Sequence, residues 1–121
     1  MKILGIDDNE ELLGLSETAL TFEGHEYTGI DNGRDGLQAI RDEKFDIVLL
    51  DLSMPEFSGI DVIDALVKDG IMNKQKIVIF TATDPTKKEI ELYLAKGVHS
   101  ILKKPLDVDQ FTTHVQKLST E

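Results

Sequence analysis

Three apolar runs in the chain contain no polar side chain. They cover residues 3–6, 47–50 and 77–80. A short continuous apolar run, rather than one that alternates with polar residues, is typical of a strand buried on both faces in the centre of a parallel sheet. Two runs with more polar residues, 26–30 and 98–102, suit the edges of such a sheet. The pattern therefore predicts three central strands and two edge strands.

Apolar residues between these runs recur at the spacing of an α-helix. Three stripes are visible, of which the last is the most regular: Leu12, Leu15, Ala19 and Phe22; Ile60, Ile63 and Leu66 or Val67; and Val108, Phe111, Val115 and Leu118. Residues 34–43 and 86–96 are less regular, but we expect both to be helical. Gly24, Gly70 and Gly97 lie where helices should end, as glycine often does just past a C-terminus.

Strands that alternate with helices predict an α/β fold. We expect a five-stranded parallel sheet with five helices on both faces and right-handed crossovers, the doubly wound arrangement of flavodoxin-like proteins. A length of 121 residues suits one domain, so residues 1–121 are expected to form a single unit. Ligands of such folds bind beyond the carboxyl ends of the strands, which directs attention to the residues that follow each strand.

Composition narrows the classes of function. With 13 basic and 23 acidic residues the net charge is −10, which argues against direct nucleic-acid binding, because such binding needs a basic face. No apolar run approaches the ~20 residues of a membrane span. The chain has no cysteine, which excludes disulfides and thiolate metal sites and favours a reducing, cytoplasmic location.

Polar side chains follow four of the predicted strands, three of them directly. Asp7 and Asp8 follow the first, Asp51 the third and Thr81 the fourth, and Lys104 comes shortly after the fifth. Taken alone, each of them is more simply explained as a helix cap, a turn residue or a surface residue. Their joint occurrence at one edge of a parallel sheet predicts a site.

Three carboxylates in one place would repel each other, since two unit charges ~4 Å apart interact by roughly 4 kcal/mol at an effective dielectric of 20. Such a cluster persists if a cation neutralises it or if some members stay protonated. All-oxygen ligands favour a hard cation such as Mg²⁺, which keeps positions open for water and phosphate oxygens. A hydroxyl and an ammonium group nearby can bind a transferred phosphoryl group, and an aspartate can be its nucleophile.

Over nearly its whole length the chain resembles the CheY-like receiver domain of two-component response regulators. The matching pieces are Asp7-Asp8, Asp51-Leu52-Ser53-Met54-Pro55 with Gly59, Thr81-Ala82 and Lys104-Pro105. The resemblance implies a strand order of 2-1-3-4-5. It also implies a phosphoacceptor switch rather than an enzyme, one that assists its own phosphorylation and dephosphorylation. Its partners would be a sensor histidine kinase or phosphotransfer protein, whose phosphohistidine donates the phosphoryl group, and a downstream protein target.

The resemblance further implies how a Mg²⁺ ion would be held. Asp8 and Asp51 would bind it directly, together with the backbone carbonyl of Ser53. Asp7 would act through a water molecule. These assignments carry the roles of the family to the matching positions of this sequence.

The phosphoryl group would go to Asp51. Thr81 would hydrogen-bond to it and Lys104 would pair with it. Lys104 is preferred to Lys103 because it directly precedes Pro105, which would follow a cis peptide bond. These three roles, too, are implied by the resemblance.

Two positions depart from the family pattern. Ile101 stands where the family often has an aromatic residue that swings inward on activation, and Leu106 stands where it often has phenylalanine. Isoleucine is stiff about its first side-chain torsion and has no polar tip. We therefore expect the conformational change to run through residues 82–97 instead.

Three other functions are weighed against this one. A receiver-like scaffold that works without phosphorylation remains an alternative, although every acceptor-site residue is present. An aspartyl-phosphate phosphatase would need a second aspartate at D-x-D spacing, where this chain has Ser53. A flavodoxin-like cofactor binder would need a phosphate loop rich in Ser, Thr and Gly after the first strand, where this chain has Asp-Asp-Asn-Glu-Glu.

Overall fold

The computed structural model describes residues 1–104 and 107–120. Its strands are β1 (Lys2–Ile6), β2 (Glu26–Ile30), β3 (Ile47–Leu50), β4 (Lys76–Thr81) and β5 (Ser100–Lys103). Its helices are α1 (Glu10–Phe22), α2 (Gly33–Asp42), α3 (Gly59–Asp69), the short 3₁₀ helix η1 (Met72–Lys74), α4 (Lys87–Lys96) and α5 (Val108–Ser119). The expectations for Pro105 and Leu106 lie outside the described residues.

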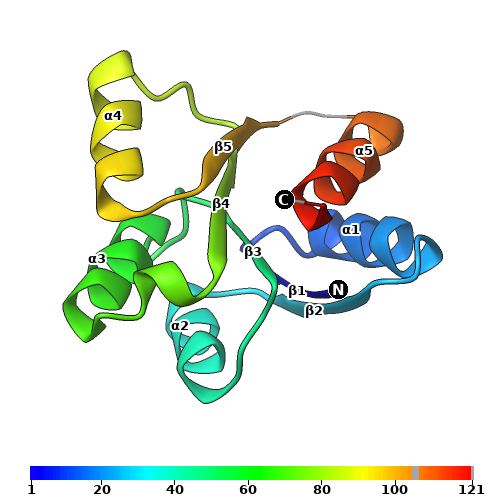
Figure 1. The fold of residues 1–121 in the computed structure, drawn as a ribbon, viewed down its shortest axis with the longest axis horizontal. Helices are drawn as coiled ribbons and strands as arrows, with labels where there is room; N and C mark the ends of the chain where they lie inside the picture. The colour runs from blue at the N-terminus through cyan, green and yellow to red at the C-terminus, as the bar shows by residue number, and fades with distance from the viewer. Residues whose placement is uncertain (105–106, 121) are drawn as a thin grey trace.

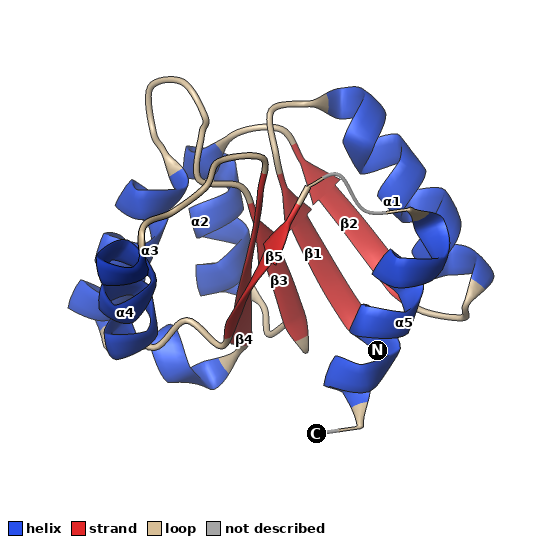
Figure 2. Ribbon diagram, turned by 90° about the horizontal axis from the view of Figure 1, so that it is seen from above, coloured by secondary structure: helices blue, strands red, loops and turns tan. Residues whose placement is uncertain are grey.

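All five strands run parallel in one sheet, in the order β2-β1-β3-β4-β5 (Figure 1). Helices α1 and α5 cover one face, and α2, α3 and α4 cover the other (Figure 2). The predicted fold class and strand order are confirmed, with the more polar strands β2 and β5 at the two edges. The order reverses between β1 and β3, which places a crevice at the carboxyl ends of these two strands.

The apolar core has two layers, one on each face of the sheet. In β3, Val48 and Leu50 pack toward α2 and α3, whereas Ile47 and Leu49 pack toward α1 and α5. Every residue of β3 is therefore buried. This two-sided burial is the physical reason for the continuous apolar run that predicted a central strand.

The stripe predicted for α1 is wrong in part. Leu15 and Phe22 are exposed by 62% and 88%, and the buried residues of this helix are Ser16 and Leu20. The other two members of the stripe, Leu12 and Ala19, are partly buried against the core, so the helix is turned part of the way from the predicted face toward Ser16 and Leu20. A serine therefore faces the sheet where the pattern predicted an apolar side chain.

The other two stripes are mostly confirmed. Ile63 and Leu66 of α3 are buried while Ile60 and Val67 are exposed, so Leu66 is the core residue of the two alternatives. In α5 the three later members of the stripe are buried, and only Val108, in the first turn, is exposed.

Glycines end three helices as predicted. Gly70 and Gly97 are C-caps with φ of 72° and 109°, and Gly24, just past α1, has φ of 88°. After Gly97 the N–H of Val98 still donates to a carbonyl in the last turn of α4. Strand β5 therefore begins at Ser100, two residues later than predicted. Among the described residues, no helix has the length and apolar character needed to cross a membrane.

Candidate functional site

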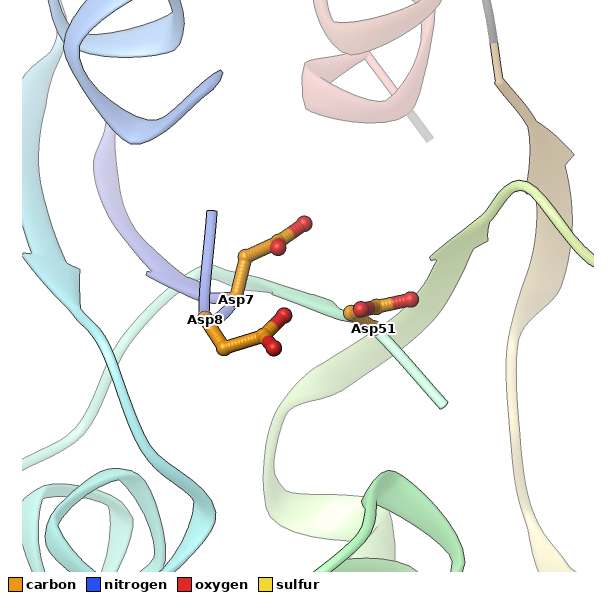
Figure 3. A group of neighbouring side chains, drawn as sticks. All are labelled: Asp7, Asp8 and Asp51. Atoms are coloured by element: carbon orange, nitrogen blue, oxygen red, sulfur yellow. The ribbon is translucent and has the colours of Figure 1, made fainter. Parts of the chain in front are cut away.

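The two neighbouring central strands bring three carboxylates together. Asp7 and Asp8 directly follow β1, and Asp51 directly follows β3. The N–H of Asp51 donates to the carbonyl of Ile6 over 3.0 Å, which ties the two strand ends side by side. One carboxylate oxygen from each aspartate lies within 4.8 Å of the others, and Figure 3 shows the three side chains gathered at this edge.

The three carboxylates differ in their access to water. Asp7 and Asp51 are 5% and 6% exposed, whereas Asp8 is on the surface. The cluster is thus a buried pair with one ligand open to solvent. Three oxygen donors at this spacing, reachable from one side, fit a hard cation such as Mg²⁺.

Lys104 supplies positive charge between the two buried carboxylates. Its ammonium donates a hydrogen bond to Asp7 Oδ2 and lies 3.8 Å from Asp51 Oδ1. The backbone N–H of Lys104 donates to the carbonyl of Thr81 over 2.8 Å, which fixes this residue beside the end of β4. When all three aspartates are ionised, one lysine leaves two negative charges uncompensated. A divalent cation would match that remainder.

Burial is the main influence on the acceptor candidate, Asp51. It raises the pKa of the Asp51 carboxyl above its ordinary value, against the nearby charge of Lys104, which lowers it. The charge of Asp7 raises the same pKa further, and hydrogen bonds from the Ser53 backbone and the Thr81 side chain lower it. Asp51 is therefore a carboxylate that is less well stabilised as an anion than one in water.

Thr81 links the carboxylates to the loop after β4. It is fully buried, and its hydroxyl lies 3.0 Å from the hydroxyl of Thr83 and accepts a hydrogen bond from the Thr83 N–H. On the surface nearby, Lys103 forms an ion pair with Asp84 of the same loop. The two adjacent lysines therefore have different surroundings, and the one that reaches the carboxylates is Lys104.

The loop after β3 is built around one close backbone approach. A Cβ on Gly59 would lie 2.2 Å from the carbonyl oxygen of Asp51, so only glycine lets α3 begin against this strand end. The N–H of Gly59 donates to the Leu52 carbonyl over 3.1 Å. Ser53 is exposed in the same loop, and its carbonyl as a metal ligand stays a prediction.

Two further residues contact the site that sequence reasoning did not single out. The N–H of Asn9 donates to Asp7 Oδ1 over 2.9 Å, while its side chain caps α1. Thr83 holds the Thr81 hydroxyl as described above. Asn9 carries a helix-start signal that points to its position, but no local pattern marks Thr83.

Ile101 lies on the far side of β5 from α5. It is partly buried and packs against the core layer formed with α4. An aliphatic side chain therefore fills the position where the family often has an aromatic one.

Comparison with known families gives one model that spans most of the chain. The model described as "Response regulator receiver domain" matches residues 3–116. A curated relative, the transcriptional regulatory protein KdpE of Mycobacterium tuberculosis, is 31% identical over 114 residues, which cover 94% of this chain and 49% of the relative. The chain spans about half the length of the curated relatives it matches.

Solved structures agree over the whole fold. The receiver domain of the Francisella response regulator 1452 superposes with a TM-score of 0.84 at 29% identity, covering 97% of this chain and 94% of the other. The response regulator TrrA of Thermotoga maritima, solved in complex with Mg²⁺ and BeF, gives a TM-score of 0.81 at 28% identity, covering 98% and 99%.

Proposed function

Because this chain belongs to the receiver domain family of two-component response regulators, we propose that Asp51 accepts the phosphoryl group. The observation that carries the proposal is the difference between the two buried carboxylates. Asp7 is engaged by Lys104 on one oxygen and by the Asn9 N–H on the other. Asp51 has a more distant lysine, at 3.8 Å, and a raised pKa. Asp51 also accepts hydrogen bonds from the Ser53 backbone and the Thr81 side chain, but burial and the longer distance to Lys104 leave its anion less stabilised, and a less stabilised carboxylate is the better nucleophile.

The transfer itself needs few groups. A carboxylate oxygen of Asp51 attacks the phosphorus of a phosphohistidine on a sensor histidine kinase or phosphotransfer protein. The phosphorus–nitrogen bond breaks, and its electron pair returns to the imidazole of the donor. The product on Asp51 is an acyl phosphate. Receivers interact with histidine kinases, and the identity of this donor is part of the proposal.

Asp8, Asp51 and the Ser53 carbonyl would hold Mg²⁺, with Asp7 acting through a water molecule. The acidic cluster supports this assignment, and so does the Mg²⁺–BeF complex of the similar regulator TrrA. When bound, the ion supplies charge that offsets the phosphoryl oxygens and the crowded carboxylates. The side chains of the receiver itself would position the incoming phosphoryl group.

Lys104 and Thr81 would bind the phosphoryl oxygens once the group has arrived. Lys104 would exchange part of its contact with Asp7 for the new charge, which lies nearer to Asp51. The Thr81 hydroxyl would exchange its contact with Thr83 for a phosphoryl oxygen. Because Thr83 begins the loop that leads to α4, this exchange would release residues 82–97 and change the surface offered to a downstream protein target.

The receiver is a phosphoacceptor switch rather than a classical enzyme, and assistance to its own dephosphorylation is part of the proposal. We also propose that residues 1–121 act as a single receiver domain, and that the protein is cytoplasmic, as the absence of cysteine suggests.

Acetyl phosphate with Mg²⁺ and intact-mass measurement test the proposal. We expect the wild type to gain the mass of one phosphoryl group, in a form that hydroxylamine removes, since hydroxylamine cleaves acyl phosphates. Asp51→Asn should gain none, while the exposed Asp109→Asn should behave as the wild type. An unlabelled wild type would favour the phosphorylation-independent scaffold. Equal labelling of Asp51→Asn would place the acceptor at another residue.

A further inference from the structure

A glycine in the middle of β1 marks a close approach by another side chain. A Cβ on Gly5 would lie 2.0 Å from the hydroxyl oxygen of Tyr27, which is on the neighbouring strand β2. Gly29, the register partner of Gly5, also lies under this ring, since its Cβ would be 3.3 Å from Tyr27 Cε2. The facing glycines thus form a flat area on which the aromatic ring lies.

The direction of the tyrosine side chain follows from the strand register. Tyr27 pairs with Ile3, yet its hydroxyl lies against Gly5, two residues further along β1. The side chain therefore leans along the strand toward its carboxyl end. Two residues beyond Gly5 is Asp7, one of the two buried carboxylates of the acidic cluster.

The Tyr27 hydroxyl has a buried neighbour in α1. Ser16 is only 6% exposed, lines the same small cavity as Tyr27, and lowers the pKa of Tyr27 as a hydrogen-bonding group. This neighbourhood suits a serine on the inward face of α1, because a buried hydroxyl needs a hydrogen-bonding partner. Burial, together with the charge of Asp7, raises the pKa of Tyr27, so the phenol keeps its proton and can donate it.

A small cavity connects this pair of hydroxyls to the acidic cluster. Its volume of ≈ 10 Å³ is close to the least that holds one water molecule. Its polar wall consists of Asp7, Ser16, Tyr27 and Asp51, and Phe80 lies among its apolar lining. A buried water needs two to four polar partners, and this wall offers both hydroxyls and carboxylates.

We propose that the hydroxyls of Tyr27 and Ser16 hold one buried water molecule that donates a hydrogen bond to the carboxylate of Asp7, which makes Tyr27 a positioning residue for that aspartate. Each Asp7 oxygen already accepts one hydrogen bond, from Asn9 or Lys104, and has a lone pair left for another. The consequence for metal binding rests on the proposed role of Asp7 around Mg²⁺.

Calorimetric Mg²⁺ titration of matched variants tests the positioning role. Tyr27→Phe keeps the ring over the two glycines and removes only the hydroxyl, and Tyr93→Phe is the control, because Tyr93 is buried in α4 on the opposite face of the sheet. Loss of a partner behind a metal ligand typically weakens binding 10–100-fold. We expect about a tenfold weaker affinity in Tyr27→Phe and none of this loss in the control. Unchanged or tighter binding by Tyr27→Phe overturns the proposal.

A spectroscopic readout separates a positioning role from a merely structural one. The chain has two tyrosines and no tryptophan, so in Tyr93→Phe the near-ultraviolet tyrosine band reports Tyr27 alone. Adding Mg²⁺ should shift that band, and adding Ser16→Ala should reduce the shift. A silent band in Tyr93→Phe overturns the proposal even if Tyr27→Phe fails to fold.

The outcomes also distinguish this inference from the proposed function. If the wild type binds Mg²⁺ and is labelled by acetyl phosphate while Tyr27→Phe binds Mg²⁺ equally well, only the role of Tyr27 fails. A wild type that binds no Mg²⁺ overturns both.

Discussion

Asp51→Asn should make the metal-free protein more stable at neutral pH. The substitution keeps the shape of a side chain that is 6% exposed and removes its charge. Burial is the largest influence on the pKa of Asp51, and it acts against the ionised form. We therefore expect the ionised Asp51 side chain to lower the free energy of unfolding when no cation is present.

The magnitude can be worked from the distances in the site. At an effective dielectric of 20, Lys104 at 3.8 Å attracts Asp51 by about 4.4 kcal/mol. Asp7, with an oxygen within 4.8 Å, repels it by at least about 3.5 kcal/mol. These two contributions nearly cancel. What remains is the burial of the charge, with a smaller repulsion from the exposed and therefore screened Asp8.

Neutralising this buried charge should raise the free energy of unfolding by about 1–2 kcal/mol, within the range usual for a single substitution. For a chain of this length, that gain in the free energy of unfolding raises Tm by roughly 4–8 °C. Saturating Mg²⁺ should shrink the gain, because the ion offsets the same charge in the wild type.

The pH dependence has a definite sign. A carboxyl whose pKa is raised on folding binds protons more tightly in the folded state, so it lowers stability as the pH rises. Below the ordinary value of 3.8, Asp51 is protonated in both states and the variant should gain nothing. The gain should grow as the pH rises from there through the raised pKa and stay constant above it.

Chemical denaturation in EDTA at pH 4 and pH 7, and again with saturating Mg²⁺, measures these differences. Asp7→Asn is the matched control. Asp7 accepts the hydrogen bond of the Lys104 ammonium, so neutralising Asp7 removes this ion pair and should give a smaller gain in stability or a loss. An Asp51→Asn variant that is no more stable than the wild type at pH 7 without metal would show that the buried charge of Asp51 does not destabilise the fold.

Other perturbations probe the metal, the fold and the switch. Asp8→Ala should bind Mg²⁺ at least about tenfold more weakly by calorimetry, and wild-type affinity should fall as the pH drops, because protons compete for the carboxylates; equal binding would place the ion elsewhere. Lys104→Ala should fold in Mg²⁺ but lose much of the chemical-shift response to phosphorylation. An unchanged response would show that Lys104 does not take part in the conformational change. Gly59→Ala should lose about 1–3 kcal/mol in a denaturation experiment, because its Cβ would lie 2.2 Å from a backbone oxygen; wild-type stability would show that the loop adjusts. Beryllofluoride with Mg²⁺ should alter amide exchange mainly at residues 82–97, and changes confined to 98–102 would assign the switch to β5.

Local pattern was enough for the strands and for the edge where polar residues gather. In a parallel sheet every strand ends at the same edge, so a residue that directly follows an apolar run is placed there whatever the strand order. Asp7, Asp51 and Thr81 are located by this rule alone. The glycine signals at the helix ends worked for a similar reason, because a left-handed backbone conformation is a property of one or two residues.

Helix orientation was not determined by the sequence pattern. In α1, apolar residues occupy more than one face, and the stripe through Leu15 and Phe22 is as regular as any other. The sheet instead contacts Ser16 and Leu20. Ser16 lines a small cavity together with Tyr27 of β2, and Tyr27 itself lies over Gly5 of β1. The orientation of α1 thus depends on α1, β1 and β2 together, and the sequence of none of these segments predicts it alone.

The pairing of charges was likewise decided by the tertiary structure. The resemblance assigns Lys104 to the phosphoryl group on Asp51, and that role stays a prediction. In the structure the Lys104 ammonium donates its hydrogen bond to Asp7, 97 residues away in sequence, and lies 3.8 Å from Asp51 Oδ1. Local preferences assign these groups to one edge of the sheet but do not fix which atoms touch. Ion-pair distances there depend on where β5 ends and on how the strand ends pack. Both are outcomes of long-range packing, and the electrostatic energy of the site varies steeply with them.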